Sequence, residues 1–211
     1  MKYLSLVLAL ITQPALAAEI MFDSGWKEQG FSLFSSNDYA LNGHSMGIVS
    51  DGSVSMTFKA VPEADWQARA ASWQWSVSRS VAATDLTVKG VDDRNIALYF
   101  VFVDPQKAAS LAGGSARRVF NDDSTRTLVY VWGGDYPRGT VLQSPFQPGK
   151  LMTIASRPAS TGNFTENADL AADFQRAYGT APGALIAIGV SADSDDTDSY
   201  IAAQISNLLL Q

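Results

Sequence analysis

Residues 71–78 alternate strictly between apolar and polar side chains, and this pattern constrains the fold more than any other part of the chain. Ala71, Trp73, Trp75 and Val77 fall on one side of an extended backbone, and serine and glutamine fall on the other. A strand of this kind has one face in the core and the other in water. The pattern therefore predicts a β-strand that buries both tryptophans.

Other segments repeat the strand signal. Segments 95–103 and 125–132 are apolar on both faces, which favours central strands. Six further strands are expected between turn-forming residues, at 20–26, 44–49, 53–60, 151–156, 185–192 and 201–210. This number of strands predicts a mainly β fold, a two-sheet antiparallel β-sandwich of jelly-roll type. A closed, lipocalin-like barrel is the alternative.

Two stretches break the strand pattern and predict short helices. The first follows Asp104 and Pro105, a cap and a first-turn proline, and ends before two glycines at 113–114. The second covers 167–178, where Leu170, Phe174 and Tyr178 form an apolar stripe and Asn167 is the expected cap.

The first 17 residues are typical of a secretory signal peptide. Lys2 precedes an apolar run that is too short to span a bilayer, and small residues at 15 and 17 suit signal peptidase. The sequence predicts cleavage near Ala17, a single β-sandwich domain over 18–211, and a periplasmic or secreted protein. No later segment reaches membrane-spanning length, and no cysteine follows to carry a lipid, so we expect neither a transmembrane nor a lipid anchor.

Composition excludes several classes of protein. The formal net charge of −6 argues against a general nucleic-acid binder, which needs a basic face for phosphates. A single histidine, His44, and the absence of cysteine exclude the usual zinc sites, cysteine nucleophiles and disulfides. His44 is expected to make a structural hydrogen bond, since no serine-hydrolase elbow accompanies it.

A series of short motifs points to a family. They are Trp-Gln-Trp at 73–75, Lys-Gly-Val-Asp-Asp at 89–93, Tyr-Phe-Val-Phe at 99–102, Leu-Val-Tyr-Val-Trp at 128–132, Ser-Pro at 144–145, Asp-Phe at 173–174, Tyr-Gly at 178–179 and Gly-Val-Ser-Ala-Asp-Ser-Asp-Asp-Thr at 189–197. Because of the order and spacing of these motifs, the chain resembles the bacterial family called domain of unknown function 3047. The resemblance covers nearly the whole mature chain. The resemblance implies an exported domain and supplies no activity. The chain departs from that pattern at Asp198, where glycine is usual, and at Tyr178, where phenylalanine is usual.

The acidic loop after residue 192 is a candidate calcium site. Asp193, Asp195, Asp196 and Asp198 place four carboxylates within six residues, and calcium prefers oxygen ligands. The loop does not match the EF-hand pattern. The alternative is a hairpin connection between the last two strands, in which these side chains cap their own turn.

A second charged group precedes the strand at 95–103. Asp92 and Asp93, with Arg94 beside them, are candidates for acid–base work on a glycoside. Neighbouring strand residues point to opposite faces, so the partner of either carboxylate would come from elsewhere. The residues considered as partners are Glu166, Asp193 and Asp195. The alternative is a solvated, salt-bridged start of a strand.

Aromatic residues in expected loops are candidates for ligand contact. Trp66, Trp132 and Tyr136 lie near acidic or basic neighbours, an arrangement that suits sugars. The alternative is that they pack loops onto the sandwich.

These observations predict an exported β-sandwich that recognises a carbohydrate or a cell-envelope polymer. One alternative is a glycoside hydrolase or polysaccharide lyase on the same scaffold, for which the residues to inspect are Asp92, Asp93, Arg94, Arg118 and Arg126. The other is a structural or partner-binding envelope protein. Calcium is the one cofactor that the sequence suggests.

Overall fold

The alternating segment forms β6 (Ala70–Arg79), an inner strand of a six-stranded sheet. The computed structural model describes residues 17–30 and 36–211, so the predicted signal segment lies almost wholly outside the described residues. Trp73 and Trp75 are each 1% exposed, which confirms the predicted orientation of this strand.

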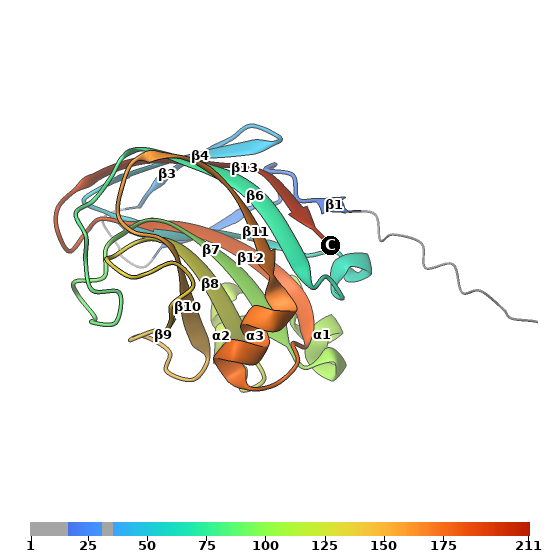
Figure 1. Cartoon of the computed structure of the whole chain (residues 1–211). Helices are drawn as coiled ribbons and strands as arrows, with labels where there is room; N and C mark the ends of the chain where they lie inside the picture. The colour runs from blue at the N-terminus through green and yellow to red at the C-terminus, as the bar shows by residue number, and fades with distance from the viewer. Residues whose placement is uncertain (1–16, 31–35) are drawn as a thin grey trace, which may run out of the picture.

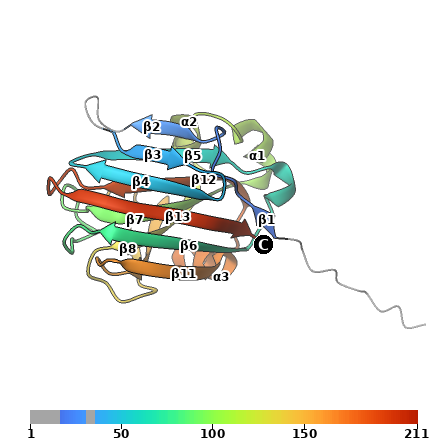
Figure 2. The ribbon, with the colours of Figure 1, turned by 90° about the horizontal axis from the view of Figure 1, so that it is seen from above.

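Two sheets pack face to face (Figure 1). The six-stranded sheet, seen in Figure 2, has the order β11 (Gly162–Asp169), β6, β13 (Tyr200–Leu210), β4 (Ser45–Asp51) and β3 (Asp38–Leu41), with β1 (Ala18–Glu19) also paired to β13. The seven-stranded sheet has the order β2 (Lys27–Gly30), β5 (Val54–Ala60), β12 (Ala184–Asp193), β7 (Arg94–Val103), β8 (Arg126–Gly133), β10 (Leu151–Arg157) and β9 (Val141–Gln143). Strands pair antiparallel, apart from the parallel pair β8–β10. The predicted mainly β sandwich of jelly-roll type is confirmed.

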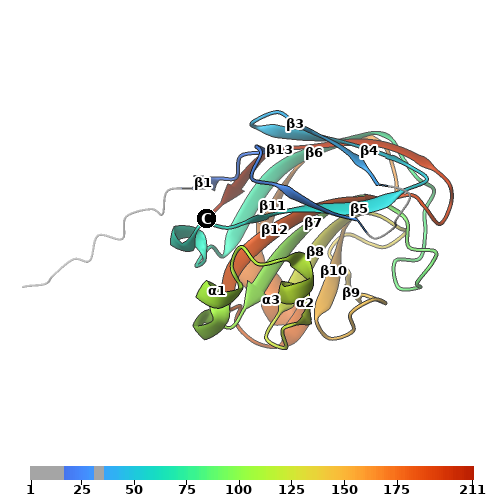
Figure 3. The same cartoon turned by 180° about the vertical axis from the view of Figure 1, so that it is seen from behind.

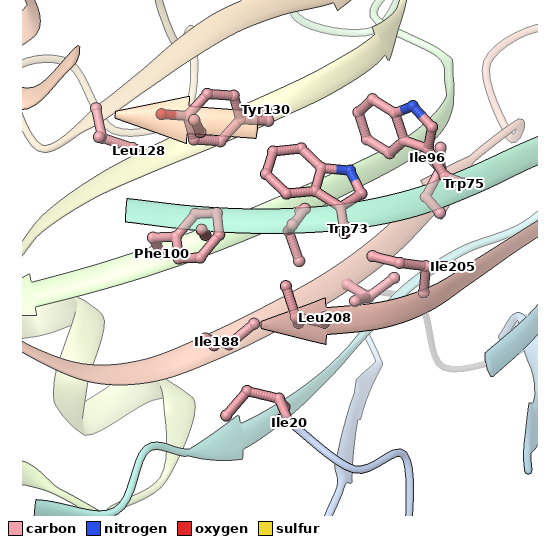
Figure 4. Close-up of a cluster of buried hydrophobic side chains, with 14 of the residues drawn as sticks. Ile20, Trp73, Trp75, Ile96, Phe100, Leu128, Tyr130, Ile188, Ile205 and Leu208 are labelled. Atoms are coloured by element: carbon pink, nitrogen blue, oxygen red, sulfur yellow. The ribbon is translucent and has the colours of Figure 1, made fainter. Parts of the chain in front are cut away.

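The core between the sheets combines aromatic rings with aliphatic side chains (Figure 4). Trp73 lies 5.4 Å from Trp75 and 5.3 Å from Tyr130, measured between ring centroids, with edge-to-face geometry. Trp75 in turn lies 5.7 Å from Trp132 of β8. Offset and edge-to-face pairs of this kind each add about 0.5–1.5 kcal/mol beyond the burial of their area.

Within residues 17–30 and 36–211, three α-helices accompany the sheets: α1 (Pro105–Leu111), α2 (Ala116–Asn121) and α3 (Leu170–Tyr178); a 3-10 turn covers Glu63–Asp65. The first predicted helix is confirmed as α1, with Asp104 accepting a hydrogen bond from the backbone N–H of Gln106. Figure 3 shows α1 and α2 on the side of the seven-stranded sheet that faces away from the other sheet. Helix α3 packs Phe174 against Phe102, with ring centroids 5.2 Å apart.

Some boundaries differ from the predictions. The strand expected at 20–26 is wrong: Phe22 makes only an isolated bridge to Gly43, and β2 begins at Lys27. The second helix begins at Leu170 with Asp169 as its cap, because Asn167 belongs to β11 and pairs with Ser72. Among the described residues, no helix is both long enough and apolar enough to cross a bilayer.

Candidate functional site

The seven-stranded sheet is apolar on both faces, as predicted for its central strands. On β7, Phe100 and Phe102 point into the core between the sheets, while Tyr99, Val101 and Val103 lie on the outer face. Helices α1 and α2 cover Val101 and Val103 at one end of this outer face. The rest of the outer face forms an open cleft.

The cleft has a volume of about 520 Å³. Its floor consists of apolar side chains from several strands, among them Met56 of β5 and Val129 and Val131 of β8. A smaller hollow of about 200 Å³ adjoins it beside α1 and α2, and both are lined by Met56, Tyr99 and Phe120. The two hollows thus lie side by side on the outer face.

Two loops form the mouth of the cleft. Phe146, which follows β9, is 52% exposed, and the Nζ atom of Lys89 lies 5.3 Å from its ring centroid. Deeper in the cleft, the Tyr99 hydroxyl lies 3.1 Å from the Ser191 hydroxyl and accepts a hydrogen bond from Arg94. These aromatic side chains were not among those predicted from the sequence.

One wall of the cleft is acidic. Strands β7 and β12 pair antiparallel, with Arg94 opposite Asp193, so the segments 92–94 and 193–196 meet. Irregular pairing at this end of both strands changes the direction of the side chains that follow. The structure therefore brings together the two charged groups that the sequence analysis singled out separately.

Arg94 holds this wall together. Its Nη1 atom lies 3.1 Å from Asp92 Oδ2 and 2.9 Å from Asp193 Oδ2. Burial raises the pKa of Asp193 to about 7; Arg94 opposes this shift and nearby Asp195 adds to it. Burial also raises the pKa of Asp92, again against the influence of Arg94.

Asp93 anchors the crossover that follows β12. It is fully buried, and its carboxylate accepts hydrogen bonds from the backbone N–H groups of Asp196 (3.2 Å) and Thr197 (2.9 Å) and from the Thr197 hydroxyl. One oxygen each of Asp93, Asp193 and Asp195 lie within 4.8 Å of one another. This group of carboxylates has the chemistry to hold a hard metal ion.

The acidic loop is not the hairpin considered as the alternative. It leads from β12 in the seven-stranded sheet to β13 in the six-stranded sheet. Asp196 accepts a hydrogen bond from the backbone N–H of Asp92. The side chain of Asp198 lies against Gly52, and the backbone of Asp198 itself has a φ of +48°. Asp196 and Asp198 are therefore outside the three-carboxylate group, whereas Asp93 belongs to it.

Glu166 lies elsewhere, on β11 of the six-stranded sheet. Its carboxylate accepts hydrogen bonds from Trp75 Nε1 (3.1 Å), Arg157 Nε (2.8 Å) and Arg138 Nη2 (2.5 Å). It is thus not a partner of Asp92 or Asp93.

The three aromatic residues predicted as a binding surface do not come together. Trp132 is fully buried and its ring packs against Trp75 and Phe164, so its predicted place on a binding surface is wrong. Trp66 is partly buried and donates its indole N–H to the Val61 carbonyl, and Tyr136 donates its hydroxyl to Asp85. These side chains do not belong to the lining of the cleft.

The remaining candidates lie outside the cleft lining too. Arg118 is on α2, and Arg126 donates to the backbone carbonyls of Asp123 and Thr125. His44 is exposed, and its Nδ1 atom lies 2.5 Å from Oε1 of Glu19.

Comparison with known proteins places the chain in a family. The model of the family described as "Protein of unknown function (DUF3047)" matches residues 24–209. The chain belongs to this family. No curated protein matches this DUF3047 chain.

Several solved structures are similar to this DUF3047 chain. One is the xyloglucanase domain of NopAA from Sinorhizobium fredii, at 8% identity and a TM-score of 0.49, covering 95% of this chain and 99% of that one. Another is the family 11 xylanase from Neocallimastix patriciarum, at 8% identity and a TM-score of 0.46, covering 92% and 95%. A third is CBM29_1, a carbohydrate-binding module from Piromyces equi, at 8% identity and a TM-score of 0.32, covering 92% and 84%.

Proposed function

We propose that this DUF3047 chain is an exported protein that binds a carbohydrate or a cell-envelope polymer in the outer-face cleft. The observation that carries the proposal is the composition of the cleft: the aromatic rings of Phe120 and Phe146 lie in one hollow with a wall of carboxylates. An aromatic ring packs against the C–H face of a sugar, and carboxylates accept hydrogen bonds from its hydroxyl groups.

Accessible carboxylates complete this arrangement. Asp195 and Asp196 are exposed and line the cleft, so they can accept hydrogen bonds from a ligand. The adjoining hollow extends the same face, which suits an extended polymer better than a single small molecule. A flat surface would instead have favoured the structural, partner-binding alternative.

Glycoside hydrolysis is the second candidate, and the buried carboxyl group of Asp193 favours it. With its pKa raised to about 7 by burial, Asp193 carries a proton in roughly half of the molecules at neutral pH, and a general acid must be protonated to act. However, Oδ2 of Asp193 faces Arg94 and Oδ1 is buried, so neither oxygen is open to a glycosidic bond. The geometry therefore favours binding over hydrolysis.

A polysaccharide lyase has less support. Such an enzyme needs a cation that neutralises the carboxylate of its substrate. Two basic residues line the cleft in the described part of the chain: Arg94 is already paired with Asp92 and Asp193, and Lys89 lies over the Phe146 ring at the mouth.

Isothermal titration calorimetry against a panel of neutral, acidic and amino-bearing oligosaccharides tests the binding function. Replacing Phe146 by alanine should weaken binding of the best ligand roughly tenfold, since stacking and ring burial are both lost. Leu41→Ala is the matched control, because Leu41 is an exposed apolar residue (39%) on the other sheet. No binding by any oligosaccharide, or equal weakening by both variants, would contradict the proposal.

A reducing-sugar assay on the same panel separates binding from hydrolysis. We expect no release of reducing ends by the wild-type protein. If the wild-type protein releases reducing ends, and Asp195→Asn or Asp196→Asn abolishes this release, the protein is a glycoside hydrolase and the proposed binding function is wrong.

Export is tested on the protein produced from the full gene. The mature chain is expected to begin near Ala18 and to be recovered outside the cytoplasm. A cytoplasmic protein that retains Met1 would contradict this part of the proposal.

A further inference from the structure

We propose that Asp93, Asp193 and Asp195 form a binding site for one calcium ion at the acidic wall of the cleft. The site would link the segment before β7 to the end of β12 and to the crossover that follows it. The proposal stands independently of carbohydrate binding, because none of its evidence concerns a sugar.

The spacing of the carboxylates suits a single ion. One oxygen from each of the three aspartates lies within 4.8 Å of the other two. Oxygen ligands lie about 2.3–2.6 Å from calcium, so two ligands of one ion are at most about 5 Å apart. The three side chains can thus contact the same ion without a large rearrangement.

The strongest sign of a missing ligand is the buried carboxylate of Asp193. Its residue is only 6% exposed, and Oδ2 pairs with Arg94 at 2.9 Å. Oδ1 is buried and accepts no hydrogen bond from any residue in the described part of the chain. A buried acceptor without a partner costs about 1–3 kcal/mol, more when it is charged, and a cation would remove that cost.

The local charge is also unbalanced. The ion pairs of this group within the described residues are those of Arg94 with Asp92 and with Asp193. Around that single guanidinium the structure gathers five aspartates, Asp92, Asp93, Asp193, Asp195 and Asp196. A divalent cation would offset this excess of negative charge.

The donor set selects the kind of ion. All three ligands are carboxylates, whereas zinc prefers nitrogen and sulfur. Calcium tolerates irregular geometry and completes its shell with backbone carbonyls and water, while magnesium demands a near-ideal octahedron. Asp195 is exposed on the cleft wall, so it gives the ion a path into the site.

Calorimetry and thermal unfolding at pH 7 test the site, with calcium chloride added to protein first stripped by EDTA. We expect one calcium ion per chain and a melting temperature several degrees higher in millimolar calcium than in EDTA. Asp193→Asn and Asp195→Asn should each weaken calcium binding at least tenfold and lose most of the thermal shift. Asp195 is exposed, so its variant remains informative even if Asp193→Asn does not fold.

The control is Asp198→Asn, which changes a carboxylate of the same loop outside the three-carboxylate group and should keep the full thermal shift. Absence of calcium binding by the wild-type protein would overturn the proposal. So would calcium binding that survives in Asp193→Asn and Asp195→Asn, or that is lost in Asp198→Asn. An equal shift with magnesium would overturn calcium as the ion.

Discussion

Glu166 and Asp193 are both buried carboxylates with arginine partners, yet their surroundings differ. Glu166 is 2% exposed, and two arginines and the Trp75 indole donate hydrogen bonds to its two oxygens. Asp193 shares one arginine with Asp92 and leaves Oδ1 without a hydrogen bond from the described residues. The first carboxylate is fully partnered within the protein, and the second is not.

The difference separates a carboxylate that is fully partnered within the fold from the carboxylate that the proposed calcium site uses. Arg157 also lies over the Phe164 ring, 3.8 Å from its centroid, so the Glu166 network joins β10 of one sheet to β11 of the other. Asp193 instead lies in the wall of an open cleft, beside the exposed Asp195, through which an ion can approach it. A carboxylate whose oxygens all have donors stabilises the fold, whereas one with an unpartnered oxygen can still bind a cation.

The largest expected change in stability comes from removing the charge of Glu166. Glu166→Gln should lower the free energy of unfolding by about 2 kcal/mol, because hydrogen bonds from two arginines to a buried carboxylate become bonds to a neutral amide. Urea unfolding measures this loss, with Glu63→Gln on the exposed 3-10 turn as the control. A loss below about 1 kcal/mol would mean that the Glu166 network is not structural.

In EDTA, Asp193→Asn should stabilise the protein, whereas Glu166→Gln should destabilise it. The folded-state pKa of Asp193 is raised to about 7 by burial, so folding favours its protonated form, and stability is lost as the pH rises from about 4 to 7. Asparagine imitates the protonated acid and keeps an acceptor for Arg94. The variant should therefore melt higher than the wild type at pH 7, and the two should converge near pH 4. Scanning calorimetry across this range checks the sign; a variant that melts lower throughout would contradict it.

The smallest expected change in stability comes from an ion pair near the surface, which serves as a reference for the two buried carboxylates. Lys107 and Asp122 form an ion pair between Nζ and Oδ1 at 2.9 Å near the surface. Lys107→Met should change the melting temperature by no more than about one degree, because solvent already screens exposed pairs. A loss comparable to that of Glu166→Gln would show that burial is not what makes the Glu166 network more stabilising than an ion pair near the surface.

Much of the fold was predictable because side-chain alternation is local. The alternation in 71–78 predicted β6 and its buried tryptophans. The same rule places Leu128, Tyr130 and Trp132 on one face of β8, so the burial of Trp132 was open to prediction too. Strand β11 was missed because Glu166 occupies an inward position, where its charge hides the alternation of Phe164, Glu166 and Ala168.

The candidate site was predictable only in its parts. The segments 92–94 and 193–196 were each singled out, but they meet through the pairing of β7 with β12, about a hundred residues apart in sequence. Which aspartates of the loop face that junction depends on the irregular pairing at the strand ends, and this has no local signal. For the same reason Asp93, and not Asp196 or Asp198, joins Asp193 and Asp195.

Addition of calcium to isotope-labelled protein, followed by amide nuclear magnetic resonance spectra at pH 7, tests the difference between the two carboxylate sites most directly. Saturable shifts should appear at residues 92–94 and 193–197, with the amides around Glu166, Arg138 and Arg157 unchanged. Unchanged spectra in the first two segments, or equal shifts around Glu166, would contradict the conclusion that the two buried carboxylates have different roles.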